Sequence, residues 1–60
     1  MTRNKIRVLI VDDNAIDREL LTSFLEEQPD FEVVGQAADA FEARGKVKSL
    51  RPDVLTLDVS

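Results

Sequence analysis

The spacing of apolar residues alternates between a strand period and a helix period, and it predicts five elements in the order strand, helix, strand, helix, strand. Residues 6–11 are apolar at nearly every position, as in a central strand that is covered on both faces. Residues 31–37 and 54–57 are the other two predicted strands. The strand at 31–37 contains Glu32 and Gly35, which favour an edge position.

Helical spacing occurs in two segments. From about Asn14 to Gln28 the apolar residues form one stripe, and Asn14 is suited to cap the helix. Pro29 closes this segment, because the residue before a proline avoids helical geometry. The stripe consists of Ile16, Leu20, Leu21, Phe24 and Leu25.

The second helical segment begins with a predicted capping box, in which Asp39 is the cap and Glu42 follows three residues later. Gly45 interrupts the helix and costs up to about 1 kcal/mol relative to alanine. Pro52 ends it. Its apolar stripe consists of Ala40, Ala43, Val47 and Leu50.

Alternating strands and helices imply parallel strands joined by right-handed crossovers. With an edge-like second strand, the expected spatial order is 2-1-3. The sequence therefore predicts an α/β fold with a doubly wound parallel sheet, built as βαβαβ. In such sheets ligands bind beyond the carboxyl ends of the strands, at the point where the winding reverses.

Two of the apolar runs end at carboxylates. Asp12 and Asp13 follow the first strand, and Asp58 follows the third. If these strands are neighbours, the three carboxylates meet at one edge of the sheet, and each pair costs about 3 kcal/mol at roughly 5 Å and an effective dielectric constant near 20. A divalent cation removes that cost, which favours a metal and phosphoryl-transfer site. The alternative is that Asp12 and Asp13 only cap the next helix and Asp58 is an ordinary strand-end residue.

Composition narrows the function classes. The chain has 60 residues, no cysteine and a net charge of −4, so it has no thiolate metal site, and its charge argues against a nucleic-acid surface. Its apolar runs are too short to span a bilayer, and its N-terminal segment lacks a small-residue cleavage site. We therefore expect a cytoplasmic chain without nucleic-acid or membrane partners, and of marginal stability because of its size.

The third predicted strand is apolar on both faces, although the order 2-1-3 places it at an edge. An unpaired apolar edge invites pairing with another strand. We therefore expect the rest of the domain to be absent or supplied by another chain. Self-association through this strand is the alternative.

Three segments resemble the receiver domain of two-component response regulators. They are Val8–Asp13, Asp30–Gly35 and Pro52–Val59, and the resemblance runs through essentially the whole chain. It implies the flavodoxin-like strand order 2-1-3-4-5. Residues 1–60 would then be the N-terminal part of a receiver domain, truncated to βαβαβ, with the remainder of the domain and any output domain absent.

Within this family, Ala37–Arg44 and Pro52–Val59 are most similar to the chemotaxis protein-glutamate methylesterases, in which a receiver precedes a C-terminal esterase domain. The receiver would then regulate that esterase. None of the 60 residues matches an esterase catalytic residue, so the resemblance leaves enzyme activity open. A receiver of a transcriptional response regulator is the alternative.

The resemblance implies that Asp58 accepts a phosphoryl group from the phosphohistidine of a sensor histidine kinase, or from a small donor such as acetyl phosphate. It also implies Mg²⁺ held directly by Asp13 and Asp58, through a water by Asp12, and by the backbone carbonyl of Ser60. The family's strand-4 hydroxyl residue and strand-5 lysine have no counterpart in these 60 residues. At most a metal site and a feeble acceptor are therefore expected from this chain by itself.

Two other site classes fit poorly. The first strand-to-helix turn has no glycine, which disfavours the dinucleotide-binding and P-loop signatures. Ser60 occupies the position where a two-aspartate phosphohydrolase would carry its second acid.

Overall fold

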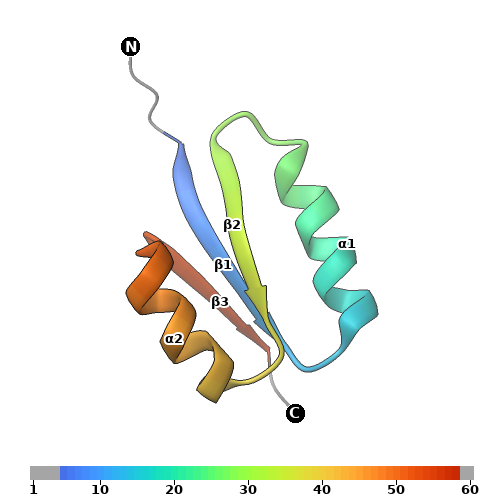
Figure 1. Cartoon of the computed structure of the whole chain (residues 1–60). Helices are drawn as coiled ribbons and strands as arrows, with labels where there is room; N and C mark the ends of the chain where they lie inside the picture. The colour runs from blue at the N-terminus through green and yellow to red at the C-terminus, as the bar shows by residue number, and fades with distance from the viewer. Residues whose placement is uncertain (1–4, 59–60) are drawn as a thin grey trace.

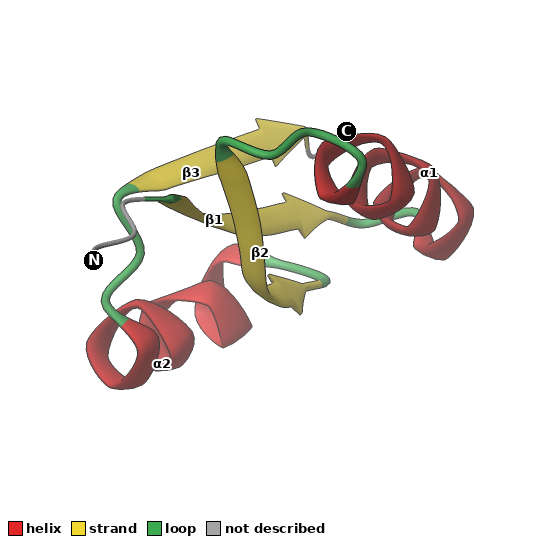
Figure 2. Ribbon diagram, turned by 90° about the horizontal axis from the view of Figure 1, so that it is seen from above, coloured by secondary structure: helices red, strands yellow, loops and turns green. Residues whose placement is uncertain are grey.

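The computed structural model describes residues 5–58, which form a three-stranded sheet with one helix on each face (Figure 1, Figure 2). All strands are parallel, and their spatial order is β2-β1-β3. The predicted fold and strand order are confirmed. The elements are β1 (Ile6–Asp12), α1 (Ala15–Glu26), β2 (Phe31–Ala37), α2 (Ala40–Leu50) and β3 (Val54–Asp58).

The core is built around β1, which has a strand on each side and a helix over each face. Its central residues Val8–Val11 are at most 2% exposed. Leu9 and Val11 belong to the cluster on the α2 side, so strand alternation places Val8 and Ile10 on the α1 side. The cluster on the α2 side also contains Ala37, Ala43 and Leu50.

Gly35 allows α2 to lie close to the sheet. It is the register partner of Leu9, next to a register shift in the β1–β2 pairing. A Cβ atom at position 35 would come within 2.8 Å of Leu50 Cδ1 and 3.3 Å of Leu9 Cδ1. The glycine that suggested an edge strand in the sequence therefore also makes room for the leucine at the end of α2.

Both helices begin at the predicted caps. Asn14 Oδ1 accepts from the backbone N–H of Ile16 at 2.9 Å and of Asp17 at 3.1 Å. Asp39 Oδ1 accepts from the N–H of Glu42 at 2.8 Å. The reciprocal bond of the predicted capping box differs, because the Glu42 carboxylate accepts from the N–H of Ala38 and not of Asp39, at 2.7 Å.

Helix α1 ends at Glu26, two residues before the predicted end at Gln28. The N–H of Gln28 donates to the carbonyl of Leu25 at 3.0 Å, which is a tighter turn than that of an α-helix. The proline at position 29 excludes helical geometry at Gln28, so the helix has to tighten and stop before it.

Only part of the apolar stripe predicted for α1 packs on the sheet. Leu21 and Leu25 are half-buried, whereas Ile16, Leu20 and Phe24 are 69%, 65% and 60% exposed. Within residues 5–58, α1 packs on β1 and β2 but not on β3. The exposed half of the stripe is therefore the half that β1 and β2 leave uncovered.

Strand β3 is the uncovered edge that the sequence predicted. It pairs with β1 on one side, and neither helix packs on it in the described part of the chain. Val54, Leu55 and Leu57 are 44%, 43% and 64% exposed. Its half-buried Thr56 has a hydroxyl without a hydrogen-bond partner among the described residues.

Neither helix in the described chain has the length and apolar character needed to cross a membrane.

Candidate functional site

The acidic ends of β1 and β3 are immediate neighbours. The two strands pair in parallel from Val8 opposite Val54 to Asp12 opposite Asp58, so the two aspartates are Cα partners in the register. Paired strands lie roughly 4.8 Å apart. Both strands run toward the same edge of the sheet (Figure 1). The chain therefore brings together two carboxylates that lie 46 positions apart in the sequence.

Asp12 is held in place at both its backbone and its side chain. It is 5% exposed. Its Oδ1 accepts from the N–H of Asn14 at 2.9 Å, and its backbone carbonyl accepts from Arg18 Nη1 at 2.6 Å. The capping interpretation is therefore only partly correct, because Asn14 caps α1 while Asp12 fixes the turn that leads into the helix.

Asp12 and Asp58 line the same open pocket, which has a volume of about 340 Å³ and lies between the strand ends and α1. Asp17, in the first turn of α1, also lines it. The three acids add negative charge to one space, so a cation entering this pocket would be stabilised. The apolar part of the lining comes from Leu20, Leu21 and Phe24.

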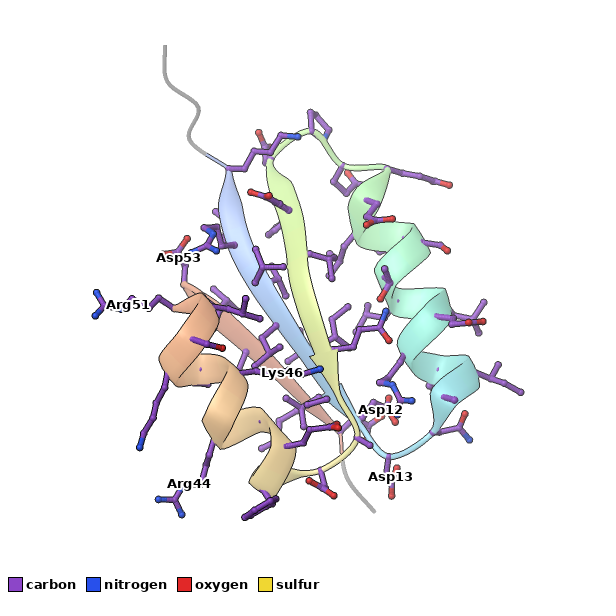
Figure 3. The ribbon with its side chains drawn as sticks, viewed as in Figure 1. Asp12, Asp13, Arg44, Lys46, Arg51 and Asp53 are labelled. Carbon is purple, nitrogen blue, oxygen red and sulfur yellow. The ribbon has the colours of Figure 1, made fainter. Side chains whose placement is uncertain are left out.

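Asp13 lies on the loop between β1 and α1, at the same edge of the sheet, and is exposed (Figure 3). As placed, the side chains of residues 5–58 form no group of three acidic, histidine or cysteine ligands that could hold a metal ion. The structure thus pairs Asp12 with Asp58, whereas Asp13 would have to turn toward them to complete the predicted set. Ser60 lies outside the described residues.

The other acids near helix and strand ends have structural partners. Asp39 and Glu42 bond backbone N–H groups at the start of α2. Asp53 ties β3 to β1, because its carboxylate accepts from the N–H of Arg7 at 2.9 Å and its own N–H donates to the Arg7 carbonyl at 2.8 Å. Asp39 and Glu42 therefore cap α2, as the sequence predicted, and Asp53 links the start of β3 to β1.

A polar network that the sequence pattern did not predict lies beside the site. Thr22 Oγ1 donates to the carbonyl of Arg18 at 2.7 Å, and Gln36 Nε2 donates to Thr22 Oγ1 at 2.9 Å. From the other face of the sheet, Lys46 reaches across the β2 edge and its Nζ donates to the Gln36 carbonyl (Figure 3). The sequence offered one signal for this network, because Arg18 and Thr22 are polar residues one helical turn apart.

Comparison with known proteins identifies the family. The response regulator receiver domain matches residues 8–60. The chain belongs to this receiver family. It is 60% identical over 55 residues to the protein-glutamate methylesterase/protein-glutamine glutaminase 1 of Caulobacter vibrioides. It is 59% identical over 56 residues to the protein-glutamate methylesterase/protein-glutamine glutaminase of Hydrogenovibrio crunogenus. These matches cover 92% and 93% of the chain but only 16% and 15% of the relatives.

A solved receiver has the same fold. The response regulator domain of Thermotoga maritima CheB superimposes with a TM-score of 0.90 at 47% identity, over 95% of this chain and 42% of that one. The resemblance to the methylesterase receivers is therefore confirmed. The match also confirms the flavodoxin-like fold that the resemblance implied.

Proposed function

We propose that residues 1–60 are the N-terminal part of a receiver domain in which Asp58 accepts a phosphoryl group with the help of Mg²⁺. The observation that carries this proposal is the register pairing of Asp12 with Asp58 at the carboxyl ends of β1 and β3. Membership of the receiver family supports it. The donor would be the phosphohistidine of a sensor histidine kinase or a small acyl phosphate.

The chemistry needs a carboxylate that is accessible and anionic. Asp58 is exposed at the end of β3, so a donor can approach it. One of its oxygens would attack the phosphorus, forming an O–P bond while the P–N bond to the donor imidazole breaks. The electron pair of that bond leaves with the imidazole, and the product is an aspartyl phosphate.

The donor set at the strand ends fits Mg²⁺. This ion prefers oxygen ligands, usually takes only one or two protein carboxylates and keeps several waters. Asp13 and Asp58 would hold it directly and Asp12 through a water, with the Ser60 carbonyl as a further ligand. Bound there, it would neutralise the carboxylates and stabilise negative charge on the phosphoryl oxygens.

The function of a longer protein is a further part of the proposal. The relatives named above are methylesterase/glutaminases of which this chain spans about one sixth. We propose that the receiver belongs to a cytoplasmic chemotaxis regulator and controls a C-terminal protein-glutamate methylesterase domain. A transcriptional response regulator is the alternative, and the solved receiver of CheB favours the former.

Removing a direct ligand should weaken Mg²⁺ binding. In Asp13→Ala and Asp58→Asn we expect the affinity to fall at least about tenfold, or about 1.4 kcal/mol of binding free energy, because each change deletes one anionic oxygen ligand. Isothermal titration of the folded chain with Mg²⁺ measures this.

A matched control is Asp30→Asn, which also removes one negative charge but lies at the opposite end of the sheet, where the Asp30 carbonyl bonds the N–H of Ile6. This variant should bind Mg²⁺ like the unchanged chain. If Asp13→Ala and Asp58→Asn both bind the ion as tightly as the control does, the metal site is not at the strand ends.

A second candidate function is association through β3. Neither helix packs on this edge strand in the described chain. Leu55 and Leu57 are 43% and 64% exposed and line a pocket of about 400 Å³ beside α2. By contrast, at β2, the other edge strand, Lys46 Nζ donates to the backbone carbonyl of Gln36. A second copy, or the rest of the domain, would pair with β3. Sedimentation at several concentrations tests self-association, and a monomer at all of them with an ordered β3 rules it out.

A further inference from the structure

Arg18 contacts the site from outside the proposed ligand set. Its side chain extends from the second turn of α1 to the end of β1, where Nη1 donates to the backbone carbonyl of Asp12 at 2.6 Å. Arg18 is half-buried and Asp12 is buried, so water competes little for this bond. A charged donor makes it one of the stronger kinds of hydrogen bond.

The turn of α1 that carries Arg18 is itself tied to β2. The carbonyl of Arg18 accepts from Thr22 Oγ1 at 2.7 Å, and Thr22 Oγ1 in turn accepts from Gln36 Nε2 at 2.9 Å. Gln36 belongs to the strand on the far side of β1 from β3. Asp12 is therefore connected to both α1 and β2 by bonds that involve no residue of the loop between β1 and α1.

We propose that Arg18 is a positioning residue for Asp12, one that fixes the end of β1 so that the Asp12 carboxylate faces Asp58 and the metal. The inference rests on the proposed function, because it assigns Arg18 to the same Mg²⁺ site. The backbone carbonyl of Asp12 accepts from Arg18, and Asp12 Oδ1 accepts from the N–H of Asn14. Of the three Asp12 oxygens, Oδ2 is the one that takes part in neither bond. That oxygen is the one available to a metal-bound water.

Positioning and simple electrostatics predict opposite results when Arg18 is removed. A cation this close to the acidic pocket repels Mg²⁺, so deleting its charge alone should tighten binding. Loss of positioning should weaken binding, since outer partners of metal ligands typically contribute about 10- to 100-fold to affinity. The sign of the change therefore identifies the role.

The experiment is a Mg²⁺ titration of the 60-residue chain with Arg18→Met, which keeps the aliphatic stem and removes donor and charge. We expect the affinity to fall about tenfold. The N–H of Asn14 should exchange faster with solvent, because its acceptor Asp12 Oδ1 is no longer fixed, whereas that of Gln28 at the far end of α1 should not change. Arg18→Lys keeps a charged donor of similar reach and should restore most of the affinity.

The control for charge is Arg44→Met, which removes an exposed cation from α2 and should leave binding unchanged or slightly tighter. Unchanged or tighter binding in Arg18→Met would overturn the inference. If Arg18→Met does not fold, Thr22→Val decides, because it leaves Arg18 in place and removes the two hydrogen bonds of Thr22 Oγ1 that tie its helical turn to β2. Weaker binding is then expected, and unchanged binding contradicts the inference. If Asp58→Asn weakens Mg²⁺ binding and Arg18→Met does not, the positioning role of Arg18 fails while the proposed function stands. If Asp58→Asn has no effect, the proposed function itself fails.

Discussion

Replacing Asp58 by asparagine should abolish phosphoryl acceptance. The amide has nearly the shape of the carboxylate but lacks its anionic nucleophilic oxygen, so no acyl phosphate can form. The unchanged chain, incubated with acetyl phosphate and Mg²⁺, should become labelled slowly, and Asp58→Asn should remain at the level of a blank without protein. Intact-mass spectrometry over a time course measures the difference.

The matched control is again Asp30→Asn, an exposed acid at the opposite end of the sheet. It should be labelled at the rate of the unchanged chain. Labelling of Asp58→Asn at that same rate would mean that another carboxylate accepts the group, and Asp58 would lose its proposed role. Removal of Mg²⁺ by a chelator should suppress labelling of the unchanged chain, because the carboxylates at the strand ends would then repel the anionic donor.

Truncating Ile10 to alanine should remove a large share of the chain's free energy of unfolding. Ile10 is fully buried in the central strand, between Gln36 on β2 and Thr56 on β3. Such a truncation costs about 2–5 kcal/mol. A stability of about 0.05–0.15 kcal/mol per residue gives this chain only about 3–9 kcal/mol in total. Urea denaturation followed by circular dichroism measures the loss.

The control for this change is Leu20→Ala, which truncates an apolar side chain that is 65% exposed on α1. It should alter the free energy of unfolding by no more than about 0.5 kcal/mol. An equal loss in the two variants would show that β1 is not the centre of the core, and the register that pairs Asp12 with Asp58 would then be in doubt.

The fold was accessible from the sequence because local patterns and topology agree. The apolar run of β1 matched a central strand, and Asn14 and Asp39 marked both helix starts. The orientation of α1 was not accessible. Its stripe of five apolar residues is wider than the face that β1 and β2 offer, so periodicity alone could not tell that Leu21 would pack and Leu20 would not.

The candidate site was predictable as far as backbone register determines it. Two strands that end in acids and lie side by side had to bring Asp12 and Asp58 together. The contribution of Arg18 was not predictable, because it depends on how far a long side chain reaches back over the end of β1 from the next helix. Asp13 illustrates the same limit, since register fixes where its loop begins but not where its carboxylate points.

The most direct test of the central claim is to locate the phosphoryl group on the chain. After incubation with acetyl phosphate and Mg²⁺, borohydride reduction converts an acyl phosphate into a stable alcohol whose position can be sequenced by mass spectrometry. The account predicts modification at Asp58, and none when Mg²⁺ is removed. Modification at Asp39, Glu42 or Asp53 in place of Asp58, or equal modification without Mg²⁺, would contradict it.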